Sequence, residues 1–169
     1  MKTIRETRQV VIDKFMNQVN FKDGDVILEP SAGVGLLADG IKRHCPGVTV
    51  HTVELNQECR NELYDKGYNI VGNDFFLFNP KIKYDYVIGA PNFRNNVDCN
   101  HVIKMYDCVK DGGIVVSIMS PCWMTGDTYI QINFRKWLED KKYQITILPD
   151  NSYMEEGKTV PTILIKIIK

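Results

Sequence analysis

The chain has 169 residues, 44% of them hydrophobic, and its 21 basic and 21 acidic side chains give a formal net charge of zero. This length and composition fit one domain with a buried core, and no apolar run approaches the roughly 18 residues that a membrane span needs. We expect a cytoplasmic protein without a signal peptide and without a membrane partner, and the neutral charge argues against one that holds nucleic acid mainly by its overall field.

Apolar runs typical of strands alternate with amphipathic segments typical of helices along the chain. A helix is expected over 4–19, and a first strand starts at Val26. Further strands are expected over 48–53, 69–71, 84–88, 114–119, 143–148 and 162–168, with a turn at 110–113 and the last two strands as an antiparallel hairpin. This alternation predicts an α/β fold with a seven-stranded, mostly parallel sheet, an antiparallel last strand and helices on both faces.

The segment VILEPSAGVG, residues 26–35, is the most informative part of the sequence. An apolar strand runs into Glu29 and then into a turn with Gly33 and Gly35, which can adopt positive φ and approach a ligand closely. The predicted helix after the turn presents unpaired amide groups at its N-terminus. This arrangement is typical of a site for a nucleotide-like cofactor.

The spacing of small residues leaves the cofactor open. With Ala38 as the third small residue the turn also fits the dinucleotide fingerprint, and Glu54 follows Gly33 at roughly the 20-residue distance expected of a ribose-binding acid. Glu29 favours another cofactor, because a carboxylate at the strand tip repels a pyrophosphate and attracts the ammonium and sulfonium charges of S-adenosylmethionine. The methyl donor is the favoured interpretation, and a nicotinamide dehydrogenase is the alternative.

Four motifs follow successive predicted strands. They are EPSAGVG at 29–35, VELN at 53–56, GNDF at 72–75 and YDYVIGAPNF at 84–93. In this order they resemble the class I S-adenosylmethionine-dependent methyltransferases, and most closely the small bacterial and phage relatives of the DNA adenine-N6 methyltransferases. The resemblance covers nearly the whole chain. It implies a Rossmann-like fold and a single methyltransferase domain over 1–169 without a separate target-recognition domain.

The resemblance implies a role for each matching residue around S-adenosylmethionine and its product S-adenosylhomocysteine. Glu54 would hold the ribose hydroxyls, Leu55 would pack on the adenine, and Asp74 would accept the exocyclic amine with Phe75 beside it. Thr7 matches a Thr-Pro pair of the relatives only in its first residue, because Arg8 follows it. The implied cofactor site consists of Thr7, Glu29, Pro30, Ser31, Ala32, Gly33, Gly35, Glu54, Leu55, Asp74, Phe75 and Ala90.

The loop after the fourth predicted strand departs from the family pattern. Relatives carry Asn-Pro-Pro-Phe or Asp-Pro-Pro-Tyr there, whereas this chain has Ala90-Pro91-Asn92-Phe93. In the relatives the Asn or Asp oxygen and a backbone carbonyl accept the two hydrogens of the adenine N6, and losing one such hydrogen bond costs about 3 to 4 kcal/mol. Ala90 offers no side-chain oxygen, although Pro91 keeps its carbonyl and Phe93 is placed to stack on a flipped base.

Three explanations for Ala90 stay open. The chain is an inactive relative that still binds cofactor, it uses Asn92 as a displaced acceptor, or it carries an Asn-to-Ala substitution introduced to disable catalysis. A methyltransferase for another amine, such as a protein glutamine amide, is a further alternative. A planar amide nitrogen is a poor nucleophile for the same reason as the adenine N6, because its lone pair is delocalised, and it would need the same help from this loop.

DNA or RNA is the expected substrate, and its contacts are expected from Phe93, Arg94 and Trp123. Pro121-Cys122 is similar to the Pro-Cys nucleophile of cytosine-C5 methyltransferases but follows the fifth strand, which favours a structural cysteine; Trp123 fits either a packed corner or a lip over a bound base. A homodimer or a partner subunit for target recognition stays open. Five cysteines without a C-x-x-C pair and three scattered histidines predict neither a disulfide framework nor a metal site.

Overall fold

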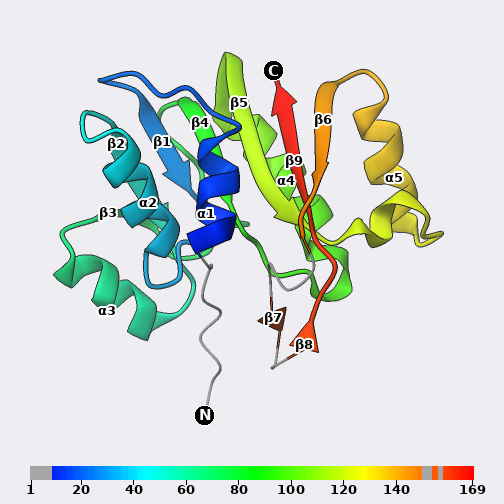
Figure 1. Ribbon diagram of the computed structural model, residues 1–169, viewed down its shortest axis with the longest axis horizontal. Coiled ribbons are helices and arrows are strands. Elements are labelled where there is room, and N and C mark those ends of the chain that lie inside the picture. Colours follow the sequence, from blue (N-terminus) through cyan, green and yellow to red (C-terminus); the bar gives the residue numbers. More distant parts are fainter. Residues whose placement is uncertain (1–8, 150–153, 156–157) are drawn as a thin grey trace.

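The computed structural model of the chain describes residues 9–149, 154–155 and 158–169. A seven-stranded sheet forms its centre, with the strand order β3-β2-β1-β4-β5-β9-β6 (Figure 1). The strands are β1 (Val26–Glu29), β2 (Thr49–Val53), β3 (Asn69–Gly72), β4 (Tyr84–Gly89), β5 (Val109–Met119), β6 (Lys142–Ile147) and β9 (Ile163–Ile168).

The pairs from β3 to β5 are parallel, whereas β9 is antiparallel to both of its neighbours, β5 and β6. This confirms the predicted seven-stranded, mostly parallel sheet with an antiparallel last strand. Because parallel strands point the same way, the carboxyl ends of β1, β2, β3 and β4 meet at one edge.

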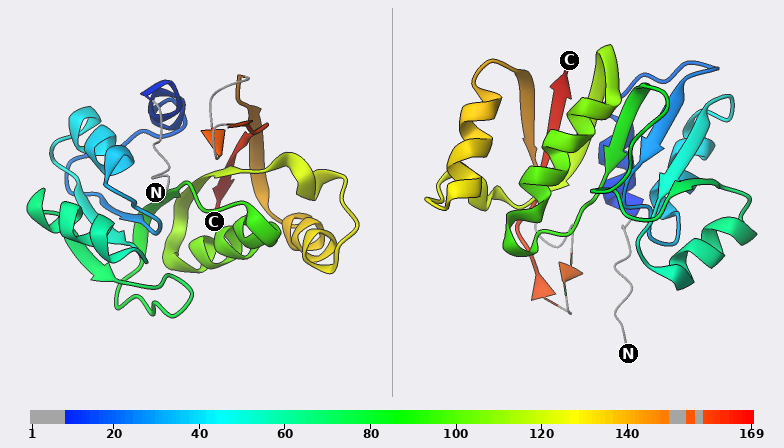
Figure 2. Two further views of the ribbon diagram at one scale, coloured as in Figure 1. Left: turned by 90° about the horizontal axis from the view of Figure 1, so that it is seen from below. Right: turned by 180° about the vertical axis from the view of Figure 1, so that it is seen from behind.

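Helices cover both faces of the sheet (Figure 2). One core cluster joins α1 (Gln9–Met16) and α2 (Leu36–His44) to the sheet, and a second joins α4 (Val97–Cys108) and α5 (Tyr129–Leu138) to the opposite face. The connection from β2 to β3 holds α3 (Gln57–Asp65). Successive side chains of a strand point to opposite faces of the sheet, so neighbouring residues of β1 pack in different clusters: Ile27 in the first and Leu28 in the second.

Two element boundaries differ from those predicted. The first helix spans Gln9–Met16 rather than 4–19, with residues 1–8 outside the described part of the chain. The predicted turn at 110–113 lies inside β5, with Gly112 at a φ of 78°. Strand pairing continues through it, because the Gly112 amide donates to the Lys169 carbonyl and the Lys169 amide donates to Gly113. A register shift between Tyr84 and Tyr86 of β4 accommodates the extra length.

A short hairpin of β7 (Met154–Glu155) and β8 (Lys158–Thr159) lies between β6 and β9 in the chain. Its two-residue strands are too short to give a periodic signal in the sequence. Two 3-10 turns, η1 (Arg94–Asn96) and η2 (Pro121–Met124), follow β4 and β5. Across the described ranges, every helix falls short of the length and apolar character needed to cross a bilayer.

Candidate active site

The predicted cofactor residues of the described chain gather at the carboxyl edge of the sheet. The order β3-β2-β1-β4 places the loops after these four strands side by side, and the chain leaves β1 toward β2 on one side while β4 lies on the other. Ligands of open α/β sheets bind at such a reversal of strand order. The arrangement therefore brings Glu29, Glu54, Asp74 and Ala90 to one edge.

The turn after β1 requires its glycines. Gly33 and Gly35 have φ values of 53° and 85°, in the left-handed region that side chains rarely adopt. A Cβ on Gly35 would also lie 2.8 Å from the Leu63 Cδ2 atom, so both its backbone and its surroundings exclude a larger residue. The Gly35 amide donates to the Ala32 carbonyl at 2.8 Å, and the Ala32 amide donates to Val53 of β2 at 3.2 Å. The turn is thus tied to the neighbouring strand.

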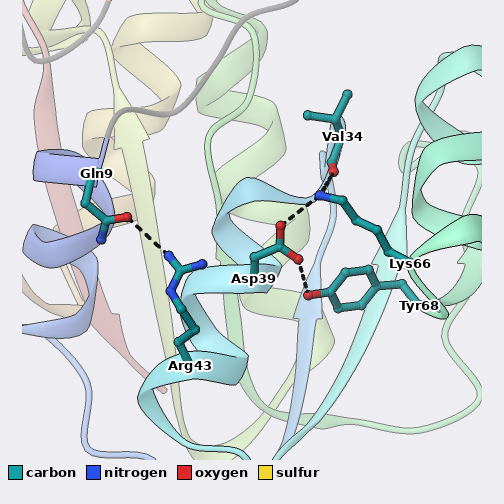
Figure 3. Close-up of polar contacts among 6 residues, drawn as sticks. All are labelled: Gln9, Val34, Asp39, Arg43, Lys66 and Tyr68. Atoms are coloured by element: carbon teal, nitrogen blue, oxygen red, sulfur yellow. Dashed lines mark hydrogen bonds and ion pairs between the residues drawn. The ribbon is translucent and has the colours of Figure 1, made fainter.

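A polar cluster outside the site supports this turn (Figure 3). The Lys66 ammonium donates to the Val34 carbonyl at 2.8 Å and to the Asp39 carboxylate at 2.7 Å. The Tyr68 hydroxyl donates to the other Asp39 oxygen at 2.7 Å. Burial, followed by the hydrogen bond to Asp39, raises the pKa of the Tyr68 phenol, so the phenol stays protonated and donating. These contacts fix the first turn of α2 before any ligand binds.

Glu54 connects the ends of β1 and β2. Its half-buried carboxylate accepts the Gly33 amide at one oxygen and the Asn56 amide at the other, both at 2.7 Å. The Arg60 guanidinium holds the following backbone by donating to the carbonyls of Glu54 and Leu55. Leu55 is 72% exposed at this edge, so its side chain is available to a ligand.

Glu29 is the least satisfied charged group at the site. Its side chain is 2% exposed, and its Oε2 atom has no hydrogen-bond partner in the described part of the chain. Burial raises the pKa of this carboxyl well above its ordinary value, the Ala38 backbone in α2 lowers it, and Glu54 raises it further. An orphaned buried carboxyl costs folding free energy, and a cationic group of a ligand would compensate for that cost.

The loop after β3 is built on buried aromatic rings. Asp74 accepts the Phe76 amide at 2.8 Å, which shapes the turn at the end of β3. Phe75, predicted to meet an adenine, is only 4% exposed, and its ring centroid lies 4.6 Å from that of His101 in α4. The Phe75 ring therefore forms the base of the loop, and the loop presents Asp74 together with the exposed side chains of Phe76 and Leu77.

The loop after β4 closes against the turn after β1. A Cβ on Gly89 would lie 3.2 Å from the Pro30 Cδ atom, so glycine permits this close approach. Ala90 is half-buried and Pro91 is buried, while Asn92 is exposed and its Oδ1 atom accepts the Arg94 amide at 2.9 Å. The Asn92 oxygen is thus oriented toward its own backbone turn.

Three solved structures share this architecture. A putative class I S-adenosylmethionine-dependent methyltransferase from Listeria monocytogenes aligns with a TM-score of 0.74 at 13% identity, over 100% of this chain and 62% of that chain. A modification subunit of a putative type I restriction enzyme from Vibrio vulnificus YJ016 aligns with a TM-score of 0.73 at 12% identity, over 97% and 44%. Precorrin-6y C5,15-methyltransferase from Geobacter metallireducens GS-15 aligns with a TM-score of 0.68 at 14% identity, over 100% and 92%.

The chain has the Rossmann-like methyltransferase fold. At these levels of identity the likeness establishes the fold and not the reaction. This chain spans less than two thirds of the length of the Listeria and Vibrio proteins. No protein-family model and no curated protein sequence matches it.

Several aromatic residues predicted for the site of this methyltransferase fold lie in its core. Phe93 is 9% exposed and belongs to the cluster that contains Leu148 and Leu164. Trp123 is 4% exposed and packs edge-on against Phe134, with ring centroids 5.0 Å apart. In this conformation Trp123 is a packed corner and not a lip over a base, and neither ring presents a free face for stacking.

Arg94 is exposed beyond the β4 loop, at the place where a nucleic-acid contact was predicted. Thr7, the remaining predicted cofactor residue, lies outside the described residues. All five cysteines are free thiols, and the described chain contains no group of three or more metal-ligating side chains.

Sequence reasoning missed the backbone of the segment after the β4 loop. Asn95 and Asn96 adopt φ values of 57° and 56°, which are rare outside glycine. The Asn96 side-chain oxygen accepts a hydrogen bond from Gln131 of α5 at 2.9 Å, which helps to hold this conformation. The consecutive asparagines were the available signal, because asparagine tolerates the left-handed region better than other side chains.

Proposed function

We propose that the chain binds S-adenosylmethionine and is a methyltransferase of the adenine-N6 type that acts on DNA or RNA, as one catalytic domain. The observation that carries the proposal is Glu29, a buried carboxyl beside the glycine turn whose Oε2 atom has no partner among the described residues. S-Adenosylmethionine carries an ammonium and a sulfonium charge, and either would satisfy this carboxylate. The pyrophosphate of a dinucleotide would be repelled by the ionised carboxylate and would offer it no compensating charge.

The acids at the neighbouring strand ends suit the rest of this cofactor. Glu54 would accept the two ribose hydroxyls, with Leu55 against the adenine and Asp74 accepting its exocyclic amine. The Glu54 oxygens accept the Gly33 and Asn56 amides, and a carboxylate has enough lone pairs to accept hydroxyl donors as well. When bound, the cofactor supplies the electrophilic methyl group; the chain supplies the site and the orientation of the substrate.

We propose that this chain transfers methyl groups slowly. Ala90 brings no acceptor to the place where relatives carry Asn or Asp. Asn92 is a poor substitute in this conformation, because it lies two residues beyond Ala90 and its oxygen is held in a turn by the Arg94 amide. An adenine N6 would then lose about 3 to 4 kcal/mol of transition-state stabilisation, which corresponds to a rate 10² to 10³ times lower. DNA is the favoured substrate, because the four motifs that follow the strands resemble those of the DNA adenine-N6 methyltransferases.

Two titrations and one assay test the proposal. Calorimetry with S-adenosylmethionine and, separately, NADH identifies the cofactor of the native chain. Methyl transfer to single-stranded DNA, double-stranded DNA and RNA is then compared between the native chain and Ala90→Asn. Binding of the methyl donor, with methylation gained on Ala90→Asn, is the expected result. Binding of NADH alone would contradict the proposal.

A cofactor-binding subunit that depends on a partner is the second candidate. Ala90 favours it, because this residue brings no side-chain acceptor to the loop that would orient a substrate amine. Cofactor binding without methylation of any nucleic acid by either chain would favour this candidate over an autonomous enzyme.

A further inference from the structure

We propose that His101 is a positioning residue that couples the glycine turn after β1 to the aromatic loop after β3, so that the two halves of the cofactor site are held in one geometry. The inference rests on the proposed function. The His101 Nε2 atom lies 3.1 Å from the Ser31 hydroxyl, which belongs to the turn. On the other side its ring centroid is 4.6 Å from that of Phe75 and 5.4 Å from that of Phe76.

The surroundings of His101 make it a fixed hydrogen-bonding group rather than a proton carrier. It is 5% exposed, and burial, followed by repulsion from Lys104, lowers its pKa to about 4, while Asp74 acts in the opposite direction. The imidazole is therefore neutral at physiological pH, with one donor and one acceptor nitrogen. Because a serine hydroxyl both donates and accepts, Ser31 can pair with the Nε2 atom in either tautomer of the ring.

Lys104, one helical turn further along α4, completes the contact to the aromatic loop. Its ammonium donates to the Phe76 carbonyl at 2.8 Å and lies 5.5 Å from the Phe75 ring centroid. The Phe75 ring is thus contacted by two side chains from α4. Because α4 follows the β4 loop directly, the helix links that loop to the two loops that would hold the cofactor.

The choice of a histidine here is not explained by packing. The Nδ1 atom is buried without a hydrogen-bond partner among the described residues, and such an atom costs stability that a phenylalanine at the same place would not. The Nδ1 atom, without a partner in the described part of the chain, lowers stability, while the Nε2 atom contacts the Ser31 hydroxyl. A histidine that is kept despite this loss of stability is consistent with a positioning role.

A double-mutant cycle on S-adenosylhomocysteine binding tests the coupling. The four chains are the native protein, Ser31→Ala, His101→Phe and the double variant, and each dissociation constant is measured by calorimetry. We expect each single variant to bind about 10-fold more weakly and the double variant to bind no more weakly than the poorer single. Additive losses, or unchanged binding in His101→Phe, would overturn the inference.

Thermal unfolding of the same chains separates positioning from packing. His101→Phe keeps the ring against Phe75 and should retain the melting temperature while losing affinity, whereas His101→Gln keeps a donor near the Nε2 position and should retain affinity within about 3-fold although it packs less well. His51→Phe is the matched control: it breaks a comparable contact of 3.2 Å to the Tyr84 hydroxyl, lies in the middle of β2 rather than at its carboxyl end, and should leave affinity unchanged.

If the native chain does not bind S-adenosylhomocysteine, the proposed function fails and the positioning role fails with it. If the native chain binds but affinity follows the melting temperature across all variants, only the positioning role fails.

Discussion

The loops after β1 and β2 differ from the loop after β4 in how their polar groups are used. The first two carry Glu29, whose buried Oε2 atom has no hydrogen-bond partner within the described ranges, and Glu54, whose carboxylate accepts two backbone amides. They also include the glycine turn, which Lys66 supports from outside the site. After β4, Ala90 offers no side-chain acceptor, Asn92 bonds to its own turn, and two residues adopt left-handed backbone. Under the proposed function, the β1 and β2 loops keep the polar groups that would bind the cofactor, whereas the β4 loop lacks the side-chain acceptor that would assist methyl transfer. We therefore expect this chain to bind the cofactor well and to transfer methyl groups slowly.

Ala90→Asn should have the largest effect. Restoring one acceptor for the substrate amine should raise methyl transfer about 10² to 10³-fold, and it should change cofactor affinity by less than about 3-fold. Radiolabelled methyl transfer to DNA measures the gain. Ala90→Leu is the control, because leucine resembles asparagine in shape but accepts no hydrogen bond. A gain of similar size in both variants would show that volume, not the acceptor, limits turnover.

Glu29→Gln should weaken S-adenosylmethionine binding by about 30-fold or more, because a buried charge pair with the ligand is lost. Binding to the native chain should strengthen as the pH rises and should release a proton, since the bound cation requires the ionised carboxyl. Calorimetry between pH 5.5 and 8 in buffers of different ionisation enthalpy measures both quantities. Equal affinity in the native and variant chains would place the cationic part of the ligand elsewhere.

The same substitution should stabilise the protein without ligand. The folded chain raises the pKa of Glu29 above the ordinary value of 4.5, so the native state holds this proton more tightly than the unfolded state. The stability contributed by the protonated carboxyl is therefore present below pH 4.5 and is lost progressively as the pH rises toward the raised pKa. Thermal unfolding should show Glu29→Gln melting higher than the native chain at pH 8, with the difference shrinking at pH 5.

Gly35→Ala should destabilise the fold by about 2 kcal/mol or more, because strain at a φ of 85° adds to a contact of 2.8 Å with Leu63. Gly33→Ala, at a φ of 53° with open space around the new methyl group, is the matched control and should cost about 1 kcal/mol. Urea unfolding measures both. Equal costs at the two positions would contradict the tight packing of α3 against the turn.

Lys66→Met should have the smallest effect. Its ion pair with Asp39 joins side chains that are 35% and 29% exposed, and such pairs contribute less than about 1 kcal/mol. We expect a small loss of stability together with a 2 to 3-fold weaker cofactor affinity, roughly 0.5 kcal/mol, because the Val34 carbonyl loses its donor. Lys136→Met on the exposed side of α5 is the control, and isothermal titration distinguishes the two. Equal effects would show that the cluster in Figure 3 does not support the turn.

Much of the fold could be predicted because strand and helix periods are local. The apolar runs gave the seven strands to within a few residues, and the acids after them marked the edge where Glu29 and Glu54 lie. The sequence could not show that Phe75, Phe93 and Trp123 point into the core, because the direction of a loop side chain depends on tertiary packing. Nor could it show the contact between Ser31 and His101, which joins residues 70 positions apart.

Calorimetric titration of the native chain with S-adenosylmethionine, beside an identical titration with NADH, tests the central claim most directly. We expect saturable binding of the methyl donor that strengthens from pH 5.5 to 8, and no binding of NADH. Binding of NADH without binding of S-adenosylmethionine, or binding of neither, would contradict a methyl-donor site built around Glu29.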